Sequence, residues 1–432
     1  MKLKLWVLFP LMIFCVQLSA QSQKQIFFTK CKSNCSPFLD LLPNNGDVIF
    51  LKKSPTKNDR VIGKVKVDED DKIYASELGT SLTTAIRPGH TLIGPYVIIK
   101  TTENLNHEQI ERLHHQYNGR LVRLFLDKEL SIASFTQSSF HKYQTNPRSV
   151  ELVRKVFTEQ VDQKYLKEKL KEYTGEISVS IGGRQVKITE RGSANGRKNA
   201  RKYLIQEFKK LGFSTSEHEY SASGANVVAV KKGSSNTNKF IVASAHLDSV
   251  HNAGADDDGT GVVGLLAIAK VFAKLKHSFN LHLVVFDEEE KGLIGSGHYI
   301  RRLASEGKVQ NLVGAIHNDM TGFDSNDDGK FHVLHCKENS SKAISDLILK
   351  HIADQSIDLK NVPACRRRSD HIRYWQYQRP AVMLIEIRQG DSDVNPHYHR
   401  SSDTVKTLNL NYFHKIIKAS VLSLATMAQV KP

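Results

Sequence analysis

Residues 284–297 read VVFDEEEKGLIGSG, an apolar run followed at once by four acids, Asp287, Glu288, Glu289 and Glu290. A short apolar run bounded in this way predicts a buried strand that ends where the acids begin. Four neighbouring anions repel one another unless a cation or a proton offsets their charge. The stretch therefore predicts that another part of the chain brings positive charge to the end of this strand.

Strands and helices alternate on both sides of this stretch, from about residue 157 to the C-terminus. The predicted strands are continuously apolar, and the clearest cover residues 240–245, 281–286, 312–316 and 381–387. Such strands, alternating with helices, predict an α/β fold in which a mostly parallel, mixed sheet lies between layers of helices. Ligands of such sheets bind at the carboxyl ends of the strands.

The first residues of the chain have the pattern of a secretory signal peptide. Lys2 and Lys4 precede an apolar stretch, residues 5–16, and the small residues Ser19 and Ala20 follow it. The stretch is too short for a spanning helix, so we expect cleavage after Ala20 and no membrane anchor. The sequence thus predicts a secreted protein, either periplasmic or extracellular.

The length of 432 residues favours two domains after the signal peptide of residues 1–20. Residues 21–150 are rich in short β-like runs separated by turn residues, which predicts a β-rich accessory domain or pro-domain. As a pro-domain, it would shield the functional rim of the second domain, residues 157–432. The formal charge of +16 is spread along the chain rather than gathered in a stripe, so we expect no nucleic-acid partner.

Export places the cysteines in an oxidising compartment, where disulfides form. Four cysteines follow the signal peptide, namely Cys31, Cys35, Cys336 and Cys365. Among the possible pairings we favour Cys31 with Cys35 and Cys336 with Cys365. Free thiols are the alternative for the first pair.

Residues of the kind that bind metals stand at the ends of three predicted strands, at the start of a predicted helix and late in the chain. They are His246, Asp248, Asp256, Asp257, Asp258, the acids at 287–290, His317, Asp319, His397 and His399. Imidazole and carboxylate ligands without thiolates suit zinc, and a shared carboxylate holds two ions about 3.5–4 Å apart. Two adjacent glutamates allow one to bind metal while the other moves protons.

The motifs AHLDS, GADDDGTG, FDEEEKGLIGS, HNDMTGF and HYHRSSDT resemble those of the exported dizinc metallopeptidases. That family includes bacterial leucyl-type aminopeptidases, and its relatives include glutamate carboxypeptidases and glutaminyl cyclases. The resemblance covers about residues 160–430. It implies two zinc ions, with cobalt or manganese as alternatives, and the removal of N-terminal residues from peptide substrates.

The resemblance also assigns roles to individual residues. The implied metal ligands are His246, Asp257 as the bridge between both ions, Glu290, Asp319 and His399. Glu289 is implied as the general base that takes a proton from a metal-bound water. Asp248 resembles the carboxylate that orients His246.

One departure from the family pattern concerns the oxyanion. Family aminopeptidases place a tyrosine just before the Asp-His stretch, and this chain has ACRRRSDHIRYW there, with Arg366 nearest the expected position. Arg366 would donate charged hydrogen bonds to the tetrahedral intermediate, and a surface arginine is the alternative. Because arginines also bind substrate carboxylates, a metallocarboxypeptidase stays open, as do a glutaminyl cyclase and an inactive binding module.

A second ion site is predicted close by in the sequence. Asp324, Asn326 and Asp328, followed by Gly329, match the opening of a calcium-binding loop. The twelfth position of that loop is His335 where a glutamate is usual, so a plain Asp-rich turn is the alternative. The sequence gives no indication of the oligomeric state.

Overall fold

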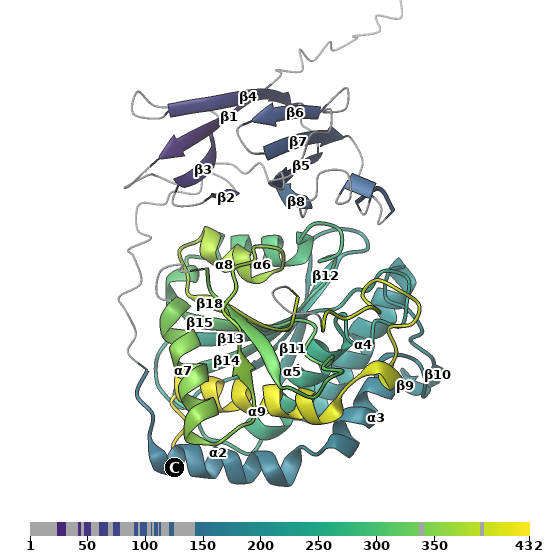
Figure 1. Ribbon diagram of the computed structural model, residues 1–432, viewed down its shortest axis with the longest axis vertical. Coiled ribbons are helices and arrows are strands. Elements are labelled where there is room, and N and C mark those ends of the chain that lie inside the picture. Colours follow the sequence, from purple (N-terminus) through teal and green to yellow (C-terminus); the bar gives the residue numbers. More distant parts are fainter. Residues whose placement is uncertain are drawn as a thin grey trace, which may run out of the picture.

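The computed structural model describes residues 143–336, 341–388 and 393–432 and, before them, eight strands and several positions between 105 and 113. The second part of the chain is built on a sheet of eight strands in the order β11-β12-β14-β13-β15-β18-β16-β17, with helices on both faces (Figure 1). This arrangement confirms the predicted α/β fold.

The central strands of this sheet are parallel. The strands are β11 (Ser214–Glu219), β12 (Ala225–Lys231), β13 (Phe240–His246), β14 (Asn280–Phe286), β15 (Leu312–Asn318), β16 (Lys330–Leu334), β17 (Lys360–Asn361) and β18 (Ala381–Glu386). Strands β14, β13, β15 and β18 run parallel to their neighbours in this group, whereas β11, β12 and β16 pair antiparallel. His246 pairs with Phe286 across β13 and β14. The carboxyl ends of these two strands therefore lie level with each other.

The helices cover the sheet in two layers. They are α2 (Pro147–Gln160), α3 (Gln163–Tyr173), α4 (Ala194–Lys210), α5 (Gly259–Phe272), α6 (Ile294–Ser305), α7 (Ser341–Asp354), α8 (His371–Gln376) and α9 (Leu410–Met427). Along β13, Ile241 and Ala243 pack in the core formed with α2, α3, α5, α7 and α9, whereas Phe240 and Val242 pack with α6 and α8. This alternation follows from the two-residue period of a strand that is buried on both faces.

The charged stretch 150–175 belongs to two helices, α2 and α3. Val161 is extended, and the carboxylate of Asp162 accepts a hydrogen bond from the backbone N–H of Tyr165 at 2.7 Å. An aspartate at this position satisfies an unpaired donor of the first turn, so it starts a new helix in preference to continuing the old one. Asn146 caps α2 in the same way.

In the predicted β-rich region, the residues that the structure describes form eight strands in two sheets of four. They are β1 (Lys24–Cys31), β2 (Leu42–Asn44), β3 (Asp47–Lys52), β4 (Arg60–Val67), β5 (Lys72–Glu77), β6 (His90–Ile93), β7 (Tyr96–Thr101) and β8 (Leu121–Leu124). Strand β8 contacts the second domain, because Arg123 N donates to the carbonyl of Gly292 at 2.9 Å and Arg373 donates to the carbonyl of Arg123 at 2.8 Å. The domain boundaries themselves stay predictions.

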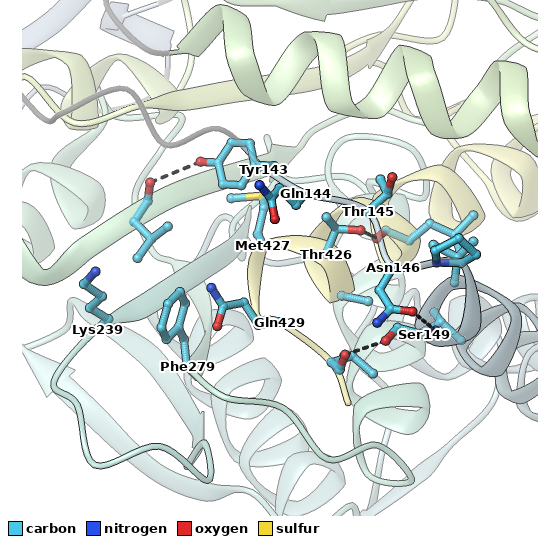
Figure 2. A pocket seen from close by; sticks show the side chains of 17 residues that line it. Tyr143, Gln144, Thr145, Asn146, Ser149, Lys239, Phe279, Thr426, Met427 and Gln429 are labelled. Carbon is cyan, nitrogen blue, oxygen red and sulfur yellow. Dashed lines mark hydrogen bonds between the residues drawn. The ribbon is translucent and has the colours of Figure 1, made fainter. Parts of the chain in front are cut away.

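A cavity lies at the end of the sheet opposite to the predicted site. Its volume is about 710 Å³, and its lining includes Lys239, Phe279 and Val313, which stand at the amino ends of β13, β14 and β15. Figure 2 shows Tyr143 donating to the carbonyl of Val313, and Ser149 of α2 turned toward the last residues of the chain. This cavity is therefore not the ligand site expected at the carboxyl ends.

One of the two predicted disulfides is present. Cys336 and Cys365 are joined, with their Cα atoms 4.7 Å apart, and the bond ties the segment after β16 to the arginine-rich loop. The pairing of Cys31 with Cys35 concerns side chains outside the described residues and stays a prediction. In the described part of the chain, no helix is both long and apolar enough to cross a bilayer.

The disulfide closes a loop of 29 residues, so its removal should lower the free energy of unfolding by about 3 kcal/mol. Urea denaturation of the Cys336→Ser/Cys365→Ser variant beside the wild type measures this difference. A reductant should leave this variant's second domain as stable as before, whereas it should destabilise that of the wild type. Equal stability of the oxidised wild type and the variant would contradict the prediction.

Candidate metal centre

The predicted ligands gather at one edge of the sheet. His246 is the last residue of β13, Glu290 follows β14 and Asp319 follows β15. Asp257 lies in the loop before α5, and His399 lies between β18 and the 3-10 helix η2 (Val405–Thr407). Because β13, β14 and β15 are parallel neighbours, their carboxyl ends meet, as the sequence predicted.

These residues form two sets of ligands that share Asp257. His246, Asp257 and Asp319 form one set, and Asp257, Glu290 and His399 form the other. The Nε2 atom of His246 lies 3.0 Å from Asp257 Oδ1, and the Nε2 atom of His399 lies 3.2 Å from Asp257 Oδ2. Each carboxylate oxygen of Asp257 thus faces a different set, which is the arrangement of a bridging ligand.

Two observations show that these residues fit divalent metal ions. Asp257 Oδ2 is buried and has no hydrogen-bond partner, and the donor set combines imidazole with carboxylate, which suits zinc. The potential at the site is also strongly negative. Burial alone would lower the pKa of His246, but Asp248 and Asp257 raise it well above its usual value. Where a proton is held this tightly, a metal cation is also attracted.

Asp319 is held in place through one of its oxygens. Ser369 Oγ donates to Asp319 Oδ2 at 2.7 Å and lies 3.0 Å from Nε2 of His317. The other oxygen, Oδ1, faces Nε2 of His246 at 3.8 Å. Ser369 therefore leaves Oδ1 directed at the metal position, a role that the sequence did not reveal.

The carboxylate of Asp248 holds the loop of the two glutamates. Its Oδ1 accepts from Glu289 N at 2.9 Å, and its Oδ2 accepts from Glu290 N at 3.1 Å. The closest carboxylate oxygen of Asp248 is 3.6 Å from Nδ1 of His246, whereas its carbonyl oxygen is 3.1 Å away. Asp248 thus contacts His246 mainly through its backbone and positions the glutamates through its side chain.

Asp258 and Asp403 act in the same way on other segments. Asp258 accepts from the backbone N–H groups of His246 at 2.9 Å and Met320 at 3.2 Å, so it joins two of the segments that carry ligands. Asp403 accepts from Asp256 N at 2.9 Å and from Asp257 N at 3.1 Å. The motif HRSSDT contained Asp403, but nothing in the sequence indicated that it would hold the bridging residue in place.

The first two acids of the cluster do not face the metal position. Asp287 pairs with Arg197 at 2.8 Å and with Arg201 at 2.9 Å, and all three side chains are buried. Glu288 pairs with Arg197 at 3.1 Å and with Lys291 at 3.0 Å. Arginines and a lysine thus offset the charge of the first two acids. Glu290 belongs to a ligand set, and Glu289 lies beside it in a further group of potential ligands with His246.

The remaining predicted residues lie outside the ligand sets. The Arg366 guanidinium donates to the carbonyl oxygen of Arg388 at 2.9 Å. In the predicted calcium loop, Asp324 accepts from the backbone of Asp328 and Gly329, and Asn326 Oδ1 accepts from Asp328 N. Among the described residues, none of these loop residues belongs to a group of potential metal ligands. Side-chain oxygens that accept from the loop's own backbone are typical of an Asp-rich turn. Calcium binding stays a prediction.

Comparisons with known proteins agree with this geometry. Residues 226–423 match the model of Peptidase family M28. A probable leucine aminopeptidase of Trichophyton verrucosum is 25% identical over 247 residues, which are 53% of this chain and 64% of the relative. Two further curated relatives are a probable leucine aminopeptidase of Arthroderma benhamiae and Aminopeptidase YwaD of Bacillus subtilis, each 26% identical in the matched segment. The matched segments span 40 to 64% of the length of these three relatives.

Solved structures share the fold. The LapA aminopeptidase of Legionella pneumophila superposes with a TM-score of 0.63 at 22% identity, over 83% of this chain and 98% of that one. A glutaminyl cyclase of Macrostomum lignano superposes with a TM-score of 0.56 at 17% identity, over 69% of this chain and 98% of that one. At these identities the likeness establishes the α/β fold alone.

The contacts of Asp403 predict that Asp403→Asn weakens metal binding. The amide keeps the shape of the side chain but offers one acceptor where two backbone N–H groups need one each, so the loop of Asp257 should loosen. Loss of such a supporting contact raises the metal dissociation constant by about 10- to 100-fold. Competition with a chromophoric chelator measures that constant. The control Asp346→Asn, which changes a surface ion pair on α7, should bind zinc like the wild type.

Proposed function

We propose that this chain removes N-terminal residues from peptides with the aid of two zinc ions. The premise is that residues 226–423 belong to Peptidase family M28, which makes the chain a metallopeptidase. The observation that carries the proposal is Asp257, whose two buried oxygens face separate ligand sets. One shared carboxylate with a histidine and an acid on either side is suited to a pair of ions.

In the proposed reaction, the zinc ions and the protein side chains have separate roles. Bound zinc supplies a Lewis acid for the scissile carbonyl and lowers the pKa of a coordinated water. Glu289 takes the proton of the attacking water and returns it to the departing amine. The side chain of Glu289 is buried. Together with His246 and Glu290 it forms a group of potential metal ligands whose ligand atoms lie within 4.8 Å of one another.

Other residues hold Glu289 and the metal ligands in position. Asp248 fixes the backbone of both glutamates, so Glu289 stays beside the ligand Glu290. When Nδ1 of His246 donates to the carbonyl of Asp248, Nε2 keeps the lone pair that a metal ligand needs. Arg366 is proposed as a donor to the oxyanion only secondarily, because its guanidinium is directed toward the end of β18.

The alternatives meet specific objections. A catalytically inactive module has no need of a buried general base beside a ligand, yet Glu289 and Glu290 are both present. A single-ion glutaminyl cyclase would leave one set incomplete, whereas both sets are complete here. A metallocarboxypeptidase shares the same centre and differs in the substrate group that it recognises, so substrates must separate it from an aminopeptidase.

Export is part of the proposal. Residues 1–20 have the pattern of a signal peptide, and the bond between Cys336 and Cys365 suits an oxidising compartment. The β-rich region is proposed as a pro-domain, because β8 contacts Gly292, two residues after Glu290. We keep calcium binding at residues 324–329 as a further part of the proposal.

Metal removal should abolish the activity, and zinc should restore it. Dialysis against a chelator is expected to leave a folded protein that does not cleave leucine amide, since no other group can replace the Lewis acid. The substrate with a blocked amine, N-acetyl-leucine amide, is the matched comparison and should be cleaved far more slowly by the zinc-loaded protein. Preference for the blocked substrate would refute the aminopeptidase proposal.

Glu289→Gln should separate metal binding from catalysis. The amide cannot carry the proton, so kcat should fall about 10³-fold or more, while the zinc content measured by atomic emission stays near two per chain. The surface variant Glu306→Gln is the control and should keep the wild-type rate. A Glu289→Gln protein with nearly normal kcat would exclude this residue as the general base.

A further inference from the structure

Two arginines lie beside the metal centre: Arg388, which has no role in the proposed reaction, and Arg366, which has only a secondary one. Arg388 follows β18 at the carboxyl edge of the sheet, and its guanidinium lies over the ring of Tyr398, 4.0 Å from the ring centroid. The Tyr398 ring stacks on the imidazole of the predicted ligand His399, with 3.7 Å between centroids and 24° between planes. Arg366 joins Arg388 through the hydrogen bond to its carbonyl oxygen.

Neither guanidinium has a carboxylate bonded to it in the part of the chain that the structure describes. Arg388 Nη1 is buried and has no hydrogen-bond partner, and Arg366 donates to a neutral carbonyl. Burial, with the nearby charges of Arg388 and Arg368, lowers the pKa of Arg366 to about 10. The two positive groups therefore repel each other in a partly desolvated place, which costs free energy unless an anion binds there.

Among the described residues, the carboxyl group of Glu386 interacts electrostatically with Arg388 but is turned toward other partners. Burial, with the negative charge of Asp256, raises the pKa of Glu386 well above its usual value. Its Oε2 accepts from Phe323 N at 2.8 Å. This hydrogen bond directs Glu386 into the interior, and among the described residues no ion pair joins it to the guanidinium of Arg388.

A small apolar cluster connects the arginines with the metal ligands. It consists of Met320, Leu334, Met383 and Ile385, with Ala364 and Tyr398 packed against it. Met320 directly follows the ligand Asp319, and Ala364 comes two residues before Arg366. Because this cluster is buried, it fixes the segments of Asp319 and Arg366 next to each other, and the two guanidinium groups beside it suit a carboxylate.

We infer that Arg366 and Arg388 bind a carboxylate of the substrate and make the enzyme selective for peptides with an acidic group near the scissile bond. The inference rests on the proposed function and adds the substrate class to it. Two groups offer this chemistry: the side chain of an N-terminal aspartate or glutamate, and the α-carboxylate of a short peptide. Both present two oxygens to the donors of the arginine forks.

The first test compares kcat/KM for glutamic acid α-amide and leucine amide. The wild type should favour the acidic substrate, and Arg388→Gln should lower the ratio of the two values by about 10- to 100-fold, as expected for a lost hydrogen bond to a charged group. Arg388→Lys should recover part of the ratio. Arg302→Gln, which removes an exposed arginine of α6, is the control and should leave the ratio unchanged.

The second test measures binding without turnover. Calorimetry on the Glu289→Gln protein should detect the binding of one of two ligands. Isoglutamine, which is the glutamic acid α-amide of the first test, carries only the side-chain carboxylate, and glutamine carries only the α-carboxylate. The ligand that binds identifies the source of the anion, and Arg388→Gln in the same protein should weaken its binding by about tenfold or more.

The outcomes separate this inference from the proposed function. If leucine amide is cleaved, but glutamic acid α-amide is not preferred and neither isoglutamine nor glutamine binds, the carboxylate site is wrong and the aminopeptidase proposal stands. The same conclusion follows if Arg388→Gln leaves both the ratio and the binding unchanged. If neither amide is cleaved by zinc-loaded protein, the proposed function fails. Carboxylate binding by the Glu289→Gln protein would then still support the arginine site.

Discussion

The structure of this chain depends on one electrostatic constraint, the gathering of buried acids at the carboxyl edge of the sheet. Asp257, Glu290 and Asp319 belong to the two ligand sets, Glu289 lies beside Glu290, and each of the four is almost fully buried. Charges of one sign so close together in a medium of low dielectric constant are tolerated only beside cations. The proposed zinc ions would supply that positive charge, with His246 and His399 as neutral ligands.

The chain holds these acids in position with further acids, which accept hydrogen bonds from the backbone. Asp248, Asp258 and Asp403 each bind two N–H groups of segments that carry or adjoin ligands. Backbone contacts of this kind fix a loop irrespective of its side chains, so the ligands keep their geometry although they come from five separate segments. Several backbone positions are strained as well, because Glu288, Met320 and His399 have positive φ angles, which are costly for residues other than glycine.

Arginines serve two opposite purposes around this edge. Arg197 and Arg201 are paired with Asp287, so they neutralise the part of the acid cluster that faces away from the ligands. Arg366 and Arg388 have no such carboxylate in the described residues. The same side chain thus stabilises the fold where an anion of the chain is near and leaves a place for an external anion where none is.

The sequence by itself determined the alternating strands and helices, the five candidate ligands and the pairing of Cys336 with Cys365. These features are local or carried by ordered motifs: an apolar strand that ends in a ligand places that ligand at the edge, whatever the rest of the chain does. It did not reveal that Asp287 and Glu288 pair with arginines, that Ser369 holds Asp319, or that Tyr398 links His399 to Arg388. Those contacts join residues up to about 90 positions apart, and only the strand order and the register of the sheet decide which of them meet.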